Sequence, residues 1–133
     1  MEKTKRDEMI EEFYYVLDQW LTMLENGKSV GAIVQETGCK NIAIYGMGAM
    51  ARHLLYALKN TTVKVVCVLD NVAREYYGNI RTQTVSECNE TVDLVIYTNP
   101  KEDAQVLQKI VQKYECPVVS LVDVVFDNIY PVD

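Results

Sequence analysis

The sequence predicts an open, doubly wound α/β domain with a parallel sheet, preceded by a helical extension. From residue 41 onward, short apolar runs alternate with segments in which apolar residues recur at spacings of three and four. Strands that are apolar on both faces are typical of parallel sheets, because such sheets are covered by helices on both sides. Short connections between alternating strands and helices also favour right-handed crossovers in one sheet.

Residues 1–38 are expected to form the helical extension, and residues 39–133 the sheet domain. Residues 7–26 have the periodicity of one amphipathic helix. Asn26 and Gly27 favour its end, since both tolerate the left-handed conformation. Ser29 is a suitable N-cap for a second, shorter helix that closes at Gly38.

Within the sheet domain, an asparagine and a proline predict where one of the helices begins. Asn99 is a suitable N-cap, Pro100 suits the first helical position, and Glu102 would complete a capping box. The pattern predicts strands at 41–46, 63–69, 92–97 and 117–121, with a weaker one at 80–85. It predicts helices at 49–59, after residue 99, and as a last turn at 122–126.

Composition and charge exclude several classes of function. The chain of 133 residues has 13 basic and 19 acidic residues, a net charge of −6, which disfavours nucleic acid as a partner. No apolar run approaches the ~20 residues that cross a bilayer, so we expect no membrane insertion. The four cysteines contain no CxxC pair and His53 is the only histidine, so we expect no metal site. Without a signal peptide, reduced thiols indicate a cytoplasmic protein.

A glycine-rich motif lies where the first strand should lead into a helix. It has the form G-x-G-x-x-A, in which the first glycine permits a tight turn and the second leaves room for a pyrophosphate. The small last residue allows close packing of helix on sheet, and the helix N-terminus attracts phosphate. Alternatively, the glycines only close a turn. The motif comprises Gly46, Met47, Gly48, Ala49, Met50 and Ala51.

Asp70 follows the second predicted strand, 24 residues after Gly46. A carboxylate at this position can accept hydrogen bonds from both ribose hydroxyls, and its charge would repel a 2′-phosphate. It therefore predicts a cofactor site for NAD rather than NADP, with the adjacent Asn71 included. The alternative is that Asp70 opens a turn with Asn71.

Thr98, Asn99 and Pro100 follow the third long strand at its carboxyl end. In doubly wound sheets, the ribose or nicotinamide part of a nucleotide lies in the crevice at this edge. These three residues are therefore included in the predicted site. The alternative is that they only cap the next helix.

Five stretches of the domain resemble a small Rossmann domain of bacterial polysaccharide (capsule) biosynthesis, over residues 39–126. The stretches are 41–48, 65–70, 77–80, 92–100 and 116–121. Such domains occur alone or fused to nucleotide-sugar epimerases, dehydratases and sugar transferases. The resemblance implies that NAD(P) or a nucleotide sugar is bound by Gly46, Gly48, Ala51 and Asp70.

The sequence thus predicts a Rossmann-like module that binds a small nucleotide, with NAD(H) favoured over NADP or a nucleotide sugar. We expect an accessory role in sugar-nucleotide or polysaccharide metabolism, beside a sugar-nucleotide enzyme or a glycosyltransferase. One alternative is a minimal NAD-dependent oxidoreductase completed by a second subunit. The other is an interaction domain that binds no nucleotide. No residue is assigned a catalytic role.

The apolar stripe of the first helix predicts a homodimer. Its residues approach the spacing of a coiled-coil seam, over fewer than the three to four heptads of an independent coiled coil. A second copy would cover apolar surface that otherwise lowers solubility. The alternative is that the helix folds back onto its own sheet. The residues of this stripe are Phe13, Leu17, Trp20, Leu21 and Leu24.

Overall fold

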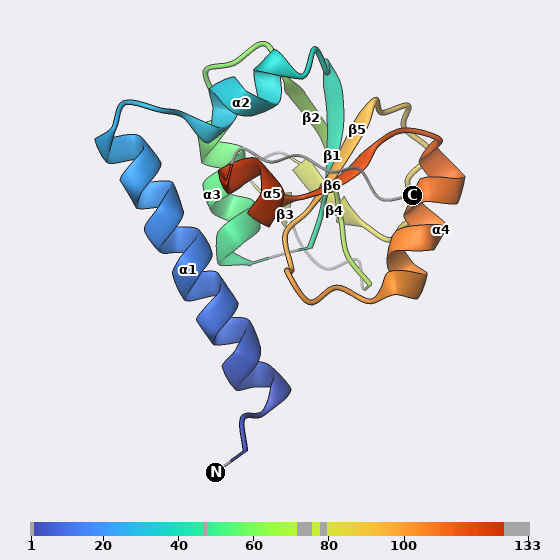
Figure 1. Ribbon diagram of the computed structural model, residues 1–133. Coiled ribbons are helices and arrows are strands. Elements are labelled where there is room, and N and C mark those ends of the chain that lie inside the picture. The colour runs from blue at the N-terminus through green and yellow to red at the C-terminus, as the bar shows by residue number, and fades with distance from the viewer. Residues whose placement is uncertain (1, 47, 72–75, 78–79, 127–133) are drawn as a thin grey trace.

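A computed structural model describes residues 2–46, 48–71, 76–77 and 80–126, and it confirms the predicted fold class. Five parallel strands form the sheet, and a short antiparallel strand lies at one edge (Figure 1). The order across the sheet is β3-β4-β2-β1-β5-β6. The strands are β1 (Asn41–Tyr45), β2 (Lys64–Leu69), β3 (Tyr76–Tyr77), β4 (Ile80–Gln83), β5 (Leu94–Tyr97) and β6 (Val118–Ser120).

The strand order creates a crevice at one edge of the sheet. The chain moves outward from β1 to β2 and β4, then returns to the other side of β1 to form β5 and β6. The direction reverses between β1 and β5, and ligands of doubly wound sheets bind beside the carboxyl ends of the strands at such a switch point. In this chain those ends are Tyr45 and Tyr97.

Helices cover both faces of the sheet. One core cluster joins one face of the sheet to α1 (Lys5–Glu25), α2 (Val30–Glu36), α3 (Ala49–Ala57) and α5 (Leu121–Val125). The other cluster joins the opposite face to α4 (Ala104–Tyr114). In Figure 1, α4 accordingly lies across the sheet from the other helices. Among the described residues, no helix is long and apolar enough to cross a membrane.

The helical extension packs against the sheet domain instead of standing apart from it. Thr4 and Asp7 form a reciprocal capping box, so α1 begins two residues before the predicted helix. Val16, Trp20 and Met23 are buried in the core, and the Trp20 ring lies edge-on to His53 at 6.2 Å. The part of the predicted stripe that contains Trp20 thus packs within its own chain, as in the alternative in which the helix folds back onto its own sheet.

The predicted start of the fourth helix was wrong. α4 begins at Ala104, and the carboxylate of Asp103 caps it by accepting from the Gln105 amide at 2.7 Å. Asn99 instead accepts a hydrogen bond from the Lys101 amide at 2.9 Å, and its carbonyl accepts from the Glu102 amide. The sequence offers two capping residues four positions apart, and the second is used. The residues between them form a turn beside the crevice.

Candidate functional site

The crevice at the switch point is a cavity of about 460 Å³, open to solvent. Three segments that follow strands meet there, after β1, β2 and β5. They bring together most of the residues predicted from the sequence, which lie far apart along the chain. Eight of the eleven predicted residues line the cavity: Gly46, Gly48, Ala49, Met50, Asp70, Asn71, Thr98 and Asn99.

The other three predicted residues do not line it. Ala51 is fully buried beneath the cavity, where its small side chain lets α3 pack closely on the sheet, as predicted. Pro100 is half-buried in the neighbouring turn, outside the cavity lining. Met47 lies outside the described residues.

Gly46 is required by the contact between the two central strands. Its φ is +108°, a conformation that side chains rarely adopt, and a Cβ there would lie 2.4 Å from the Thr98 hydroxyl oxygen. The buried Thr98 hydroxyl donates to the Tyr45 carbonyl at 3.2 Å. Gly46 therefore allows the chain to turn out of β1 directly against Thr98. The Thr98 hydroxyl holds this turn rather than facing the cavity as a free group.

Gly48 differs from Gly46, because there is room on the side where a Cβ would point. Its φ is +117° and its ψ is −163°, and a Cβ there would meet no atom within 4 Å. Gly48 is the N-cap of α3, and no side chain caps the helix there. The site thus combines the positive end of a helix dipole with open space beside the backbone. This is the geometry that a pyrophosphate requires.

Asp70 and Asn71 form a small hydrogen-bonded unit at the end of β2. The Asp70 carboxylate accepts from the Asn71 amide at 2.7 Å, and Asn71 Oδ1 accepts from the Tyr45 hydroxyl at 2.6 Å. Burial, with the nearby charges of Glu102 and Asp70, raises the pKa of Tyr45 to about 12, so it stays protonated and donating at neutral pH. Asp70 therefore makes a turn contact with Asn71 while its carboxylate remains at the cavity.

Sequence reasoning missed Glu102 as a residue of the crevice, since it was assigned to a capping box. The structure places it in the cavity lining, facing the same space as Asp70. Burial raises the pKa of Glu102, and the nearby charges of Asp103 and Asp70 add to the effect. None of the described residues lining the cavity is basic. Phosphates bound there would thus depend on backbone amides.

We expect Glu102→Gln to raise the melting temperature at pH 7 and to change it little near pH 4. A carboxyl whose pKa is raised by folding costs nothing below its unfolded pKa, where both states are protonated. The cost grows as the pH rises from the unfolded pKa to the raised folded pKa, is complete above it, and is removed by glutamine. Differential scanning calorimetry from pH 4 to pH 7.5 measures this, with the exposed Glu36→Gln as control. An increase in melting temperature that is the same at every pH would contradict the buried-charge explanation.

The sequence also gave no sign that α1 would form one wall of the crevice. Met9, Phe13 and Leu17 line it opposite the glycine loop. Oε1 of Glu12 also lies 3.9 Å from Nζ of Lys101, a residue of the turn between β5 and α4. The helix thus covers part of the cavity. Its amphipathic pattern was visible in the sequence, but not the surface it would pack against.

Within the described part of the chain, no cluster of histidine, cysteine and acidic side chains is suited to hold a metal ion. The free thiols of Cys67 and Cys88 are fully buried beside each other beneath α4, remote from the crevice lining. The crevice therefore offers a ligand backbone amides, the side chain of Asp70 and an apolar wall.

The chain was compared with protein-family models, with curated proteins and with solved structures. None of the three comparisons gives a match.

Proposed function

We propose that this chain is a nucleotide-binding module and that its ligand is NAD(H). The geometry of Gly48 carries the proposal: a glycine N-cap with positive φ, beside which a Cβ would meet no atom within 4 Å, lies at the switch point of a doubly wound sheet. A turn that only connected strand to helix would not need the space beside this glycine. Asp70 lies in the same cavity, where it is suited to bind ribose hydroxyls.

The charge of the cavity favours NAD over NADP, and its apolar wall favours NAD over a nucleotide sugar. A 2′-phosphate would lie next to the Asp70 carboxylate, in a cavity that also contains Glu102 and has no described basic residue in its lining. The apolar wall formed by Met9 and Phe13 is suited to a flat ring at the far end of the crevice. A sugar, with its many hydroxyls, would find few partners on that wall.

Isothermal titration calorimetry of the full chain tests the proposal with NAD, NADH, NADP and a UDP-sugar. We expect saturable binding of NAD or NADH and at least about tenfold weaker binding of NADP, a difference of ~1.4 kcal/mol. If none of these ligands binds at millimolar concentration, the proposal fails and the interaction-domain alternative leads. Tighter binding of a UDP-sugar than of NAD would overturn the choice of ligand.

We expect Asp70→Asn to narrow the preference for NAD over NADP to about threefold or less. The substitution removes the charge that repels the 2′-phosphate, and it weakens the hydrogen bonds to the ribose of NAD. Affinity for NAD should fall while affinity for NADP should rise or stay constant. The matched control is Asp103→Asn, which caps α4 outside the cavity lining. An unchanged NAD/NADP ratio in Asp70→Asn would show that this carboxylate does not face the ribose.

The wider role proposed here follows from the resemblance noted in the sequence. The module would serve sugar-nucleotide or polysaccharide metabolism in the cytoplasm, beside a sugar-nucleotide enzyme or a glycosyltransferase. An oxidoreductase completed by a second subunit is the second candidate, and it is favoured by the cavity's open side, which leaves room for substrate. Hydride transfer from NADH, followed at 340 nm with candidate sugar nucleotides, separates the two roles.

The proposal includes assembly into a homodimer through α1. Although Trp20 is buried in its own chain, the helix still exposes Leu21 and Leu24, with 58% and 54% of their surface accessible. Leu17 is exposed at its edge. Three leucines on one side of a helix are a surface that a second copy would cover.

A further inference from the structure

Helix α1 carries two parallel apolar stripes, and the chain buries only one of them. The inner stripe, with Val16, Trp20 and Met23 as its buried members, packs on the sheet domain. The outer stripe is offset by one residue and follows the alternating spacing of four and three that is typical of a coiled-coil seam. Every member of the outer stripe is exposed: Ile10, Tyr14, Leu17, Leu21 and Leu24.

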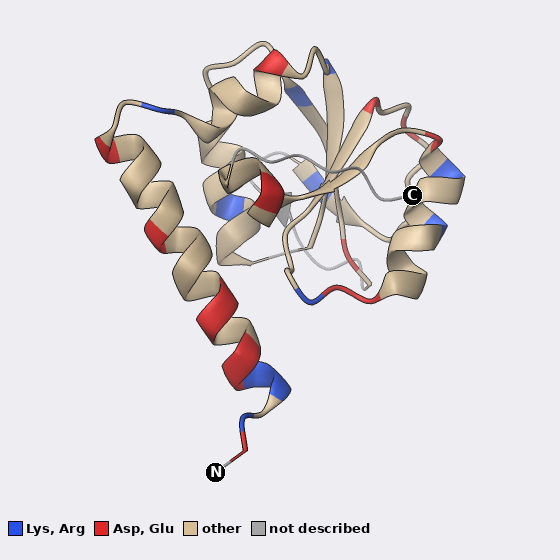
Figure 2. Ribbon diagram, viewed as in Figure 1, with Lys and Arg blue, Asp and Glu red and all other residues tan. Residues whose placement is uncertain are grey.

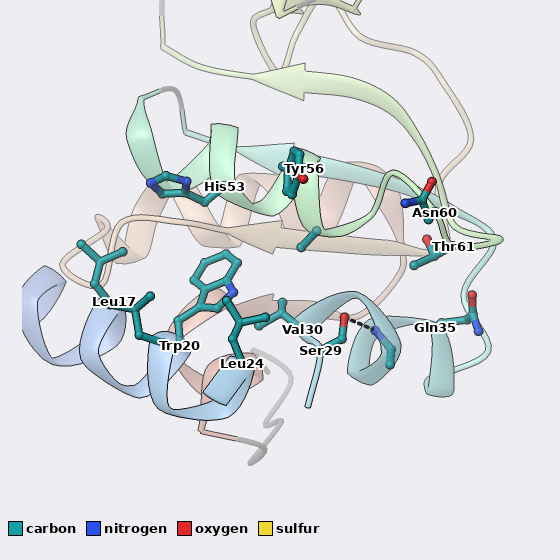
Figure 3. A pocket seen from close by; sticks show the side chains of 13 residues that line it. Leu17, Trp20, Leu24, Ser29, Val30, Gln35, His53, Tyr56, Asn60 and Thr61 are labelled. Carbon is teal, nitrogen blue, oxygen red and sulfur yellow. Dashed lines mark hydrogen bonds between the residues drawn. The ribbon is translucent and has the colours of Figure 1, made fainter. Parts of the chain in front are cut away.

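Beside the outer stripe lies the largest cavity among those described, of about 690 Å³, which we name the outer groove. It runs between α1 on one side and α2 and α3 on the other. Figure 3 shows Leu17, Trp20 and Leu24 on one wall, with His53 and Tyr56 on the facing helix. The groove contains none of the residues of the proposed nucleotide site except Leu17, which lines both cavities.

The two flanks of the outer stripe differ in charge. On the flank away from the groove, Asp18 and Glu25 are exposed next to Leu17 and Leu24, and acidic residues recur along α1 (Figure 2). On the groove side, none of the lining residues is acidic. The ammonium group of Lys59 lies there, 5.9 Å from the centre of the Tyr56 ring.

We infer that the outer groove holds α1 of a second copy of this chain, in parallel orientation. A two-fold axis running along the helices places the outer stripes against each other, and it turns the acidic flank of each copy toward the groove side of the other, where Lys59 lies. An antiparallel pair would instead bring the two acidic flanks together. Charge complementarity therefore selects both the occupant and its direction.

The parallel arrangement also accounts for the part of α1 that its own chain leaves uncovered. Figure 1 shows the first turns of α1 extending beyond the sheet domain. In a parallel pair these turns lie against their counterparts, so that Ile10 and Tyr14 of the two copies meet. The inference rests on the proposed homodimer but not on nucleotide binding, because the outer groove and the crevice are separate cavities.

Light scattering coupled to size exclusion tests the interface on the full chain. The wild type should give about twice the chain mass of 15.2 kDa, and Leu21→Glu should weaken the dimer at least about 100-fold and give monomers at micromolar concentration. The matched control is Thr22→Glu, an exposed change at the neighbouring residue outside the outer stripe that should leave the dimer intact. Circular dichroism confirms that each variant is folded. A monomeric wild type, or a dimer that survives Leu21→Glu, overturns the inference.

Disulfide cross-linking tests the direction of the two helices. In a parallel pair, Ile10→Cys lies next to Ile10→Cys of the partner and should form an interchain disulfide on oxidation with diamide, whereas Tyr15→Cys and the wild type should not. Cross-linking of Ile10→Cys only to Leu24→Cys in a mixture of the two would show an antiparallel pair and overturn the inference. Titration of Leu21→Glu with NAD distinguishes the two proposals. If the wild type is a monomer and still binds NAD, only the dimer proposal fails.

Discussion

Gly31→Ala should destabilise the chain by about 3 kcal/mol, although alanine is the better helix former. Gly31 lies in α2, and a Cβ there would lie 2.2 Å from the carbonyl oxygen of Ala57 and 3.0 Å from a methyl group of Thr61. Helix propensity alone would favour alanine by about 1 kcal/mol. The obstacle is backbone at the end of α3, which cannot rotate away, so the two helices must separate. Overpacking of this kind costs typically 1–3 kcal/mol and sometimes more.

Thermal and urea denaturation measure this effect. A loss of about 3 kcal/mol lowers the melting temperature of a chain of this size by roughly 12 °C. Ala32→Gly is the matched control, because Ala32 is the next residue of α2 and is exposed. It should lose only the propensity difference of about 1 kcal/mol. If Gly31→Ala were as stable as the wild type or more so, the close packing of α2 on α3 would be wrong.

The strands and the parallel sheet could be predicted because they depend on short-range patterns, whereas the order of the strands came only from the structure. The run before Gly46 and the run before Asp70 are apolar on both faces, and only a sheet covered by helices on both sides buries such runs. Short connections through helices then favour parallel strands joined by right-handed crossovers. The glycine motif and Asp70 meet in one cavity for the same reason: both follow parallel strands, whose carboxyl ends share an edge.

The start of α4 could not be predicted from the same kind of pattern. Asn99 and Asp103 are both good caps, and Pro100 suits a first helical turn. What decides between them is tertiary: the turn after β5 must first pass the crevice, where Glu102 contributes to the lining. Glu102 was missed for this reason, since its place at the crevice depends on a turn that local sequence did not specify.

The side of α1 that packs on the sheet domain also could not be predicted from local sequence. Trp20 and Leu21 are adjacent, and each belongs to an apolar stripe with the spacing of a helix face. Periodicity identifies the helix and its wide apolar surface, but it does not tell which stripe meets the sheet. The structure buries the stripe of Trp20 and leaves that of Leu21 exposed. Only the packing against α5 and α3 distinguishes the two.

Gly48→Ala should abolish detectable nucleotide binding while the chain remains folded. With φ at +117° and ψ at −163°, Gly48 has a backbone conformation that is almost confined to glycine. An alanine there either strains the backbone by about 1–3 kcal/mol or rotates the peptide that opens α3. In both cases its methyl group occupies the open space beside the helix N-terminus. A pyrophosphate then loses its approach to the amides.

Loss of two hydrogen bonds to a charged phosphate, at 1.5–3 kcal/mol per bond, lowers the affinity at least about 100-fold. Calorimetric titration with NAD measures it. Gly38→Ala is the control, because Gly38 also has a positive φ, of +84°, and a Cβ there would likewise meet no atom within 4 Å. Both variants should lose stability through backbone strain. Only Gly48→Ala should lose affinity for NAD, since Gly38 lies outside the crevice lining. If Gly48→Ala bound NAD as tightly as Gly38→Ala does, the ligand would not approach the backbone at this glycine, and the helix N-terminus would not be its phosphate site.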